Sequence, residues 1–333
     1  MKLVLKKSQN DIFLKLKEAT ESLFGLHLEN PIPINLGYIN LKWKVESEKG
    51  LFVIKQISKE RYAKHDFEVI ISEQELALHE QLRQFENGTL CPKVLIQKDK
   101  IIHKSSCDER FIIMEFVDGK NLLPGTLNEK QMYSLGQMTA HMHNVANDGT
   151  YSNEKNPKFI PQNVEERLDY WNSIYESNEE NNQFRELVEN QMKATKQFNL
   201  GMINSCDPGW AHRDLWVDNI LFRGDQLSAI LDFDRFAFDY PELDIARAIM
   251  SGALNGDTFN ENCAKAFLDG YRTKRNLEKG VFVRSLYLLW YMESPWWIRS
   301  NLNYDRYQEV QFQNEMIWLG ENLIYLREMF GDW

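Results

Sequence analysis

The sequence predicts an α+β fold with two lobes: a small lobe built on an antiparallel sheet with one long helix, and a larger, mainly helical lobe. Three observations lead to this expectation. The 333 residues exceed the usual size of a single hydrophobic core. Short alternating runs dominate up to about residue 117, and helical periodicity dominates after Leu127. We therefore expect two domains, 1–117 and 118–333.

The small lobe should begin with a helix over 10–24, where apolar residues recur at helical intervals. From Ile32 the sequence changes to the alternating runs PIPINLGYIN, LKWKVES and LFVIKQIS, which predict three antiparallel strands joined by tight turns. A long helical pattern then runs from Tyr62 to Phe85 and stops before Gly88. The runs KVLIQ, KIIHK and FIIMEFVDG predict two or three further strands.

The larger lobe carries helical periodicity over 129–145, 164–175 and 184–198. Two brief apolar runs, NILF and LSAILDF, interrupt the helical pattern. They predict a hairpin that turns at Gly224-Asp225. Helical patterns then resume to the end of the sequence.

Composition excludes several classes of partner. The formal net charge of −10 makes the averaged surface repel phosphate backbones and anionic membranes, so we expect no nucleic-acid partner. The four cysteines form no CxxC pair, which argues against a zinc site or a redox motif. No apolar stretch approaches a membrane span, and the first residues lack a secretory signal pattern. We expect a cytoplasmic protein without a membrane partner, of open oligomeric state.

The most informative segment is HRDLWVDN, residues 212–219, which fits the pattern H-R-D-L-x-x-x-N of phosphoryl-transfer catalytic loops. An acceptor hydroxyl must be aimed at the γ-phosphate and relieved of its proton, and the carboxylate of Asp214 can do both. Asn219 offers magnesium a neutral oxygen ligand. His212 is interpreted as a structural residue that braces the loop.

A second acidic segment, Asp232-Phe233-Asp234, lies thirteen residues beyond Asn219. This spacing leaves room for a strand, a tight turn and a returning strand, so a hairpin should bring Asp232 back beside Asn219. Magnesium prefers hard oxygen ligands and keeps several waters, which one Asp, one Asn and nucleotide phosphates can complete. Asp232 is the primary metal-ligand candidate, and Asp234 is a further one.

The strand Phe52-Val53-Ile54-Lys55 ends in a lysine, similar to the V-A-I-K strand that delivers a lysine to nucleotide phosphates. The long helix that follows should supply a carboxylate to orient this ammonium group. Glu75 is our choice, with Glu73 and Glu68 as alternatives.

Two further segments are candidates for nucleotide binding. Gly37 lies in the turn between the first two predicted strands, where it could cover the phosphates, although the G-x-G-x-x-G pattern is absent. The run MEFV ends the last strand of the small lobe and joins the two lobes. There the main-chain groups of Glu115 and Val117 could contact the adenine edge.

Together these residues resemble the aminoglycoside phosphotransferase and choline kinase family, which includes homoserine kinase and spore-coat kinase relatives. The resemblance covers about residues 30–330. It implies a protein-kinase-like bilobal fold with ATP bound between the lobes. It also implies that Asp214 is the catalytic base, that Asn219 and Asp232 hold Mg²⁺, and that Lys55 contacts the α- and β-phosphates.

The sequence departs from the family pattern at Arg213, where the family more often has a small residue and protein kinases have arginine. Arg213 is therefore a further candidate site residue. After Asp234, however, the chain enters a helical pattern without room for an activation segment, and no A-P-E follows. This favours a small-molecule hydroxyl acceptor. Asp244 resembles the aspartate with which the family braces the catalytic loop, although an acid in a first helical turn is also favoured by the helix dipole.

The acceptor is the least determined part. The run YLLWYMESPWWIRSN gathers Glu293, Trp296 and Trp297, which could suit a cationic aminoalcohol or aminosugar through ionic and cation–π contacts. Such aromatic clusters are also commonly packed in a core. Two other functions stay open, a non-catalytic protein of spore-coat type with a kinase-like fold and a protein Ser/Thr kinase.

Overall fold

The structure is a computed structural model that describes residues 2–35, 40–60, 62–152 and 156–333, with side chains from residue 9 onward. The chain packs as two units. Unit 1 comprises Met1–Gly119 together with Ser228–Arg235, and unit 2 comprises Lys120–Leu227 together with Phe236–Trp333. The short segment 228–235 therefore packs with the N-terminal part of the chain, although the sequence suggested a single change of lobe at residue 118.

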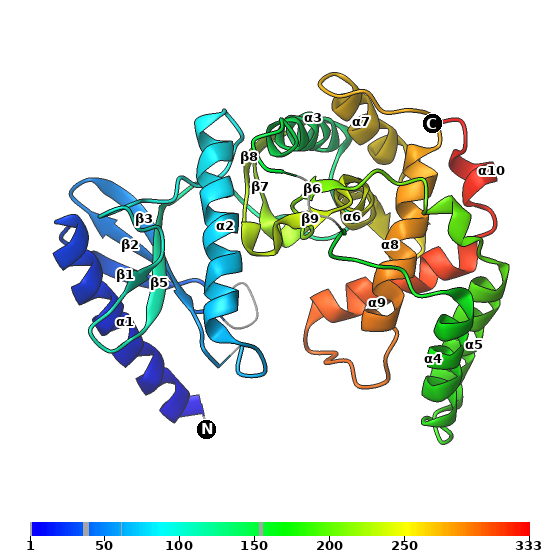
Figure 1. Cartoon of the computed structure of the whole chain (residues 1–333), viewed down its shortest axis with the longest axis horizontal. Coiled ribbons are helices and arrows are strands. Elements are labelled where there is room, and N and C mark those ends of the chain that lie inside the picture. The colour runs from blue at the N-terminus through cyan, green and yellow to red at the C-terminus, as the bar shows by residue number, and fades with distance from the viewer. Residues whose placement is uncertain (1, 36–39, 61, 153–155) are drawn as a thin grey trace. The chain divides into compact units, whose positions relative to one another are not determined.

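Unit 1 is built on a five-stranded antiparallel sheet in the order β1-β2-β3-β5-β4 (Figure 1). The strands are β1 (Glu29–Pro33), β2 (Lys42–Ser47), β3 (Gly50–Ile57), β4 (His103–Lys104) and β5 (Arg110–Glu115). The three N-terminal strands and β5 follow the sequence prediction. The run KVLIQ is not a strand, because it joins the sheet region only through isolated bridges such as Val94 with Met114.

The two helices of unit 1 cover opposite faces of this sheet, as Figure 1 shows. Helix α1 (Lys2–Phe24) packs Phe13 and Leu16 into a core with Trp43 of β2 and Phe52 of β3. This helix begins earlier than the expected residue 10. The alternation of side chains along a strand sends Phe52 and Ile54 to the α1 face, and therefore Lys55 to the opposite face.

Helix α2 (Phe67–Glu86) lies on that opposite face, where Leu78 packs with Ile57 of β3 and Ile112 of β5. It begins five residues later than the Tyr62 start that periodicity predicted. The reason is a capping interaction, because the side chain of Asp66 accepts a hydrogen bond from the N–H of Glu68.

Unit 2 is mainly helical, as the sequence predicted. Asparagine side chains cap the starts of four of its described α-helices, and two of these caps, Asn128 and Asn163, each form a capping box with the residue three positions on. Among the described residues, no helix has both the length and the apolar character to cross a membrane. The helices are α3 (Glu129–Ala146), α4 (Val164–Glu176), α5 (Asn182–Gln197), α6 (Pro241–Ala253), α7 (Glu261–Arg272), α8 (Val281–Trp297), α9 (Tyr307–Asn322) and α10 (Leu326–Phe330).

Helices α3 and α7 lie side by side at very close range (Figure 1). A Cβ atom at Gly136 of α3 would lie 2.0 Å from the carbonyl oxygen of Phe267, and one at Gly270 of α7 would lie 2.1 Å from that of Tyr133. Only glycine permits this approach, since real Cβ contacts are never so short. The close approach fixes α3, which carries a residue that supports the candidate catalytic loop.

Short strands frame that loop. Strand β6 (Gly209–Ala211) pairs antiparallel with β9 (Ala237–Asp239), and the loop follows β6 directly. A single 3₁₀ turn, η2 (Val217–Asn219), ends the loop and leads into β7 (Ile220–Arg223). The remaining short elements are β8 (Gln226–Ile230), β10 (Leu254–Asn255), β11 (Thr258–Phe259), η1 (Leu200–Met202) and η3 (Phe233–Arg235).

Candidate active site

In unit 1 the ammonium group of Lys55 is held by two aspartates. Its Nζ atom lies 3.0 Å from Oδ1 of Asp232 and 2.6 Å from Oδ1 of Asp234. The Lys55 side chain is only 4% exposed. A charged lysine buried this deeply is stable only beside carboxylates, and the fold supplies two of them.

The charges of Lys55, Asp232 and Asp234 shift one another's pKa values. Burial alone would lower the pKa of Lys55, but the negative charges of Asp232 and Asp234 outweigh it and raise that pKa. Burial would raise the pKa of Asp232, but Lys55 and Lys42 hold it well below its usual range. Burial and the charge of Asp232 raise the pKa of Asp234. Asp232 is therefore the firmly ionised member of the pair.

The acidic segment is anchored to other parts of unit 1. Asp232 has a backbone φ of +62°, a left-handed conformation that costs energy for a residue other than glycine. Gln74 of α2 donates a hydrogen bond of 3.0 Å to the carbonyl oxygen of Asp234, and the amide of Asn40 lies 3.5 Å from its Oδ2 atom. These contacts hold the strained turn against α2 and the start of β2.

Glu75 does not orient Lys55 as the sequence analysis expected. Its side chain is exposed, whereas Gln74 one position earlier is buried and faces the acidic segment. The physical reason is charge. Lys55 already neutralises two buried carboxylates, and a third one at this point would be repelled by both. Among the described residues, the carboxylate partners of Lys55 are Asp232 and Asp234.

Lys42 of β2 also belongs to this cluster, and the sequence analysis did not identify it. Its Nζ atom lies 3.3 Å from Oδ2 of Asp232, and Lys42 is directly opposite Lys55 in the β2–β3 register. The signal was present in the sequence. A two-residue turn at Glu48 and Lys49 pairs Ser47 with Gly50, and counting back along both strands pairs 42 with 55.

The proposed adenine contacts lie at the end of β5. The N–H of Glu115 is already used, because it donates to the carbonyl oxygen of Lys93 at 2.9 Å. The N–H of Val117 donates to no acceptor among the described residues. Gly37, the candidate phosphate-covering residue, lies outside the described residues.

In unit 2, Asn219 fixes the orientation of Asp214. The Nδ2 atom of Asn219 donates to the carbonyl oxygen of Asp214 at 2.9 Å and to its Oδ2 atom at 3.0 Å. No described residue donates a hydrogen bond to Oδ1 of either side chain. One carboxylate oxygen and one amide oxygen thus remain available from two partly exposed residues of the same loop.

The loop ahead of Asp214 is held by a buried aspartate of α6. Asp244 accepts the backbone N–H of His212 at 2.8 Å and that of Arg213 at 2.7 Å. Arg213 needs this support because its φ is +66°. The Oδ2 atom of Asp244, which accepts the N–H of His212, also lies 3.0 Å from the Nε2 atom of His143. Burial would raise the pKa of Asp244, but the hydrogen bond and charge of His143 and the contacts with His212 lower it.

The side chain of Arg213 forms an ion pair with a buried aspartate of unit 2. Its Nε atom donates to Oδ2 of Asp239 at 2.5 Å, and Asp239 is fully buried at the end of β9. Burial raises the pKa of Asp239, and the positive charge of Arg213 opposes this rise. The arginine thus ties the catalytic loop to the strand that pairs with β6.

Two further contacts of the loop were not foreseen. Asn121 donates to the carbonyl oxygens of Asp218 at 2.7 Å and Ile220 at 3.1 Å. The carboxylate of Asp218 accepts hydrogen bonds from Tyr307 and Gln308 at the start of α9. Such partners are brought together by tertiary folding, and no local sequence pattern marks them.

The acceptor candidates differ in their surroundings. Glu293 is buried, binds the guanidinium of Arg247 and accepts a hydrogen bond of 2.9 Å from Nε1 of Trp297. Arg247 also binds Glu315. Trp296 is 45% exposed, whereas Trp290 and Tyr291 of the same helix, α8, are fully buried. The aromatic run of α8 is therefore largely core.

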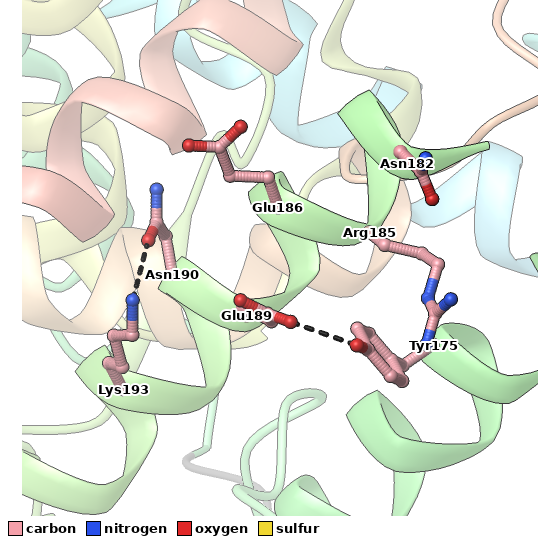
Figure 2. Close-up of a pocket in the computed structure, with 7 residues that line it drawn as sticks. All are labelled: Tyr175, Asn182, Arg185, Glu186, Glu189, Asn190 and Lys193. Atoms are coloured by element: carbon pink, nitrogen blue, oxygen red, sulfur yellow. Dashed lines mark hydrogen bonds between the residues drawn. The ribbon is translucent and has the colours of Figure 1, made fainter. Parts of the chain in front are cut away.

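A surface pocket of about 340 Å³ lies elsewhere in unit 2, between α4 and α5 (Figure 2). Several of its polar groups contact one another, although the buried Nε atom of Arg185 has no hydrogen-bond partner among the described residues. Glu189 accepts a hydrogen bond from the hydroxyl of Tyr175 at 2.9 Å, and the guanidinium of Arg185 lies 3.9 Å from the centre of the Tyr175 ring. None of the candidate catalytic residues lines this pocket, so the phosphoryl-transfer chemistry is not assigned to it.

Comparison with known proteins identifies the class. The profile of the phosphotransferase enzyme family matches residues 31–280. The chain belongs to this family, and it is therefore a small-molecule phosphotransferase, that is, a kinase. Among curated proteins it is similar to a homoserine kinase of Rhodopseudomonas palustris, with 26% identity over 248 residues that cover 73% of this chain and 69% of the relative.

Solved structures confirm the kinase-like fold. An amicoumacin kinase in complex with AMP-PNP and Ca²⁺ matches with a TM-score of 0.57 and 17% identity, over 95% of each chain. A microcompartment-associated aminopropanol kinase matches with a TM-score of 0.59 and 14% identity, over 96% of this chain and 98% of that one.

Proposed function

We propose that this kinase transfers the γ-phosphate of ATP, with Mg²⁺, to a hydroxyl group of a small amine-bearing molecule, with Asp214 as the general base. The observation that carries the proposal is the fixed orientation of Asp214. Asn219 holds its Oδ2 atom, and Oδ1 stays available to accept the proton of an incoming hydroxyl. Asp244 in turn fixes the backbone that presents Asp214.

The nucleotide would contact residues of unit 1. Lys55 would neutralise the α- and β-phosphates, since its ammonium group is fixed, buried and charged. The main-chain carbonyl of Glu115 and N–H of Val117 would contact the adenine edge. Gly37 stays a candidate for covering the phosphates.

Asn219 and Asp232 would hold Mg²⁺. Among the described residues, no cluster of three His, Cys, Asp or Glu side chains offers an all-protein metal site. This fits magnesium, which commonly takes one or two protein ligands and fills the remaining positions with phosphates and water. The Oδ1 atom of Asn219 receives no hydrogen bond from the described residues, as a ligand oxygen requires. Bound Mg²⁺ would neutralise charge that develops on the transferred phosphoryl group.

An amine-bearing acceptor is supported by acidic side chains of unit 2 and by the relatives. The carboxylates of Glu293 and Glu315 share the single guanidinium of Arg247, and burial raises the pKa of Glu315, although the charge of Arg247 opposes this rise. The negative charge of Asp214 also acts on Arg247 and helps to raise its pKa, although burial opposes this effect. The named relatives include kinases for homoserine and aminopropanol, which both carry an amine and a hydroxyl.

The test is phosphate transfer from labelled ATP to a panel of homoserine, aminopropanol, choline, an aminosugar and a Ser/Thr peptide. We expect labelling of an amine-bearing alcohol, and its loss by at least a thousandfold in Asp214→Ala with ATP binding retained. Asp225→Ala is the control, because this partly exposed carboxylate in the turn between β7 and β8 contacts Asn128 and Lys130 and none of the described candidate site residues. Labelling of the peptide alone would favour a protein kinase. Silence with every acceptor, despite ATP binding, would favour a non-catalytic scaffold.

A further inference from the structure

We propose that Lys42 is a second phosphate-binding lysine, which contacts the polyphosphate of the nucleotide beside Lys55. This inference rests on the proposed function and concerns the same nucleotide site. It assigns to β2 a side chain that takes part in recognising the nucleotide, in addition to the lysine of β3.

The register of the sheet places the two lysines together. Lys42 and Lys55 are directly opposite partners in the antiparallel β2–β3 pair. Opposite residues share one face of a sheet, with Cα atoms about 4.5–5.5 Å apart. The other face of β2 carries Trp43 and Val45, which pack into the α1 core. Both ammonium groups therefore lie on the α2 face, close enough for one polyphosphate chain to reach both.

Two like charges directly opposite each other are unfavourable unless an anion lies between them. Here the anion is the carboxylate of Asp232, with Oδ2 at 3.3 Å from Lys42 and Oδ1 at 3.0 Å from Lys55. The two lysines differ in their remaining partners. Lys55 is also bound by Asp234, whereas Lys42 has no other carboxylate partner among the described residues.

This difference predicts what happens when the nucleotide enters. Lys55 has two carboxylates as counter-charges, but among the described residues Lys42 has only Asp232, which it shares with Lys55. A phosphate oxygen can therefore complete the charge balance of Lys42 whether or not Asp232 also holds a metal ion. Access also favours Lys42, since its side chain is 19% exposed and that of Lys55 is 4% exposed. Lys42 can therefore reach a ligand without unfolding its surroundings.

Lys44 provides a matched control. It lies two positions along the same strand and on the same face, but its ammonium group is placed 4.4 Å from the centre of the Phe116 ring. Removal of Lys44 changes the net charge as much as removal of Lys42 and leaves the Asp232 cluster intact.

The test is equilibrium binding of ADP and adenosine to the full chain, with Mg²⁺ and with a chelator. We expect Lys42→Met to weaken ADP binding at least tenfold in both conditions and to leave adenosine binding within twofold. Lys44→Met should bind ADP within twofold of the wild type. Lys42→Arg should retain most of the ADP affinity, because it keeps the charge.

Other outcomes separate the possible failures. ADP binding within twofold of the wild type in Lys42→Met would overturn the inference and leave the proposed function standing. A loss seen only with Mg²⁺ would also overturn it, because Lys42 would then act only by positioning Asp232. Lys42→Gln, which can still hydrogen-bond Asp232, repeats the test if the Met variant fails to fold. Absence of any ADP binding by the wild-type chain would instead refute the proposed function itself.

Discussion

The carboxylate of Asp244 accepts the backbone N–H of Arg213 at 2.7 Å, and Arg213 is in the left-handed conformation with a φ of +66°. A buried side chain of α6 therefore stabilises a strained backbone directly before Asp214. Strain of this kind persists only where the surrounding structure compensates for it. Here the compensation also includes the second bond, from the N–H of His212 at 2.8 Å.

Asp244→Asn should therefore destabilise the protein and slow catalysis together. The amide keeps one acceptor oxygen and places an N–H group against a backbone donor. We expect a loss of about 3 kcal/mol in the free energy of unfolding, as for other broken buried charge contacts, and at least a tenfold fall in kcat. Urea unfolding and steady-state kinetics measure the two effects. Asp257→Asn, exposed between β10 and β11, is the control. An unchanged kcat would show that the loop holds its conformation without Asp244.

The pH dependence of stability should report His143. Burial lowers the pKa of this imidazole, although the hydrogen bond and charge of Asp244 oppose the shift. The unfolded imidazole titrates near pH 6.5. As the pH falls below that value, the unfolded state takes up a proton that the folded state resists. The contribution of His143 to the free energy of unfolding is therefore complete above about pH 6.5. It is lost as the pH falls toward the lower pKa of the folded state, by up to about 1.4 kcal/mol per pH unit.

His143→Gln should make this dependence shallower. Denaturant unfolding between pH 7 and pH 5 compares the slopes of the variant and the wild type. Equal slopes would mean that His143 binds its proton equally well in both states. His141→Gln, on the same helix and less buried, is the control.

Lys55 and Glu75 should respond very differently to substitution. Lys55→Met leaves Asp232 and Asp234 without their shared cation, so we expect at least a hundredfold loss in kcat/KM for ATP and a loss of about 3 kcal/mol in stability. Glu75→Gln should keep kcat/KM within twofold, because this side chain is exposed and does not contact Lys55. A large loss in Glu75→Gln would indicate that Glu75 reaches the nucleotide in the catalytic complex.

Gly136→Ala tests the close approach of α3 and α7. In an isolated helix this change is favourable by about 1 kcal/mol. In this protein the added methyl group would lie 2.0 Å from the carbonyl oxygen of Phe267, so the helices must separate. We expect a net loss of about 1–3 kcal/mol in the free energy of unfolding, as for other overpacked sites. A stabilised variant would show that the two helices can move apart at little cost.

The sequence predicted what local periodicity and turns determine. The strand β2, the strand β3 that carries Lys55, and the helices α3, α4 and α5 follow from alternation, helical spacing and cap residues. The run HRDLWVDN identified Asp214 and Asn219 as members of one loop, and they are joined by hydrogen bonds of 2.9 and 3.0 Å. These features depend on contacts between residues close in sequence.

The errors arose where polar residues are buried. The buried stripe of α2 includes Gln74, Gln81 and Gln84 beside Leu78, so apolar spacing alone did not show which face meets the sheet. One position along a helix is a rotation of about 100°, which separates buried Gln74 from exposed Glu75. Lys42 was missed because a lysine on a strand is usually solvated, and only its partner in the register shows its surroundings.

The turn between β2 and β3 consists of two residues, since Ser47 pairs with Gly50. One residue inserted there would reverse the facing of every side chain on one of the strands. Lys42 would then face the apolar core under α1, and the indole of Trp43 would face Asp232 and Asp234. Homologous kinases that share this cluster should therefore tolerate many substitutions at 48 and 49 but no single-residue insertion or deletion.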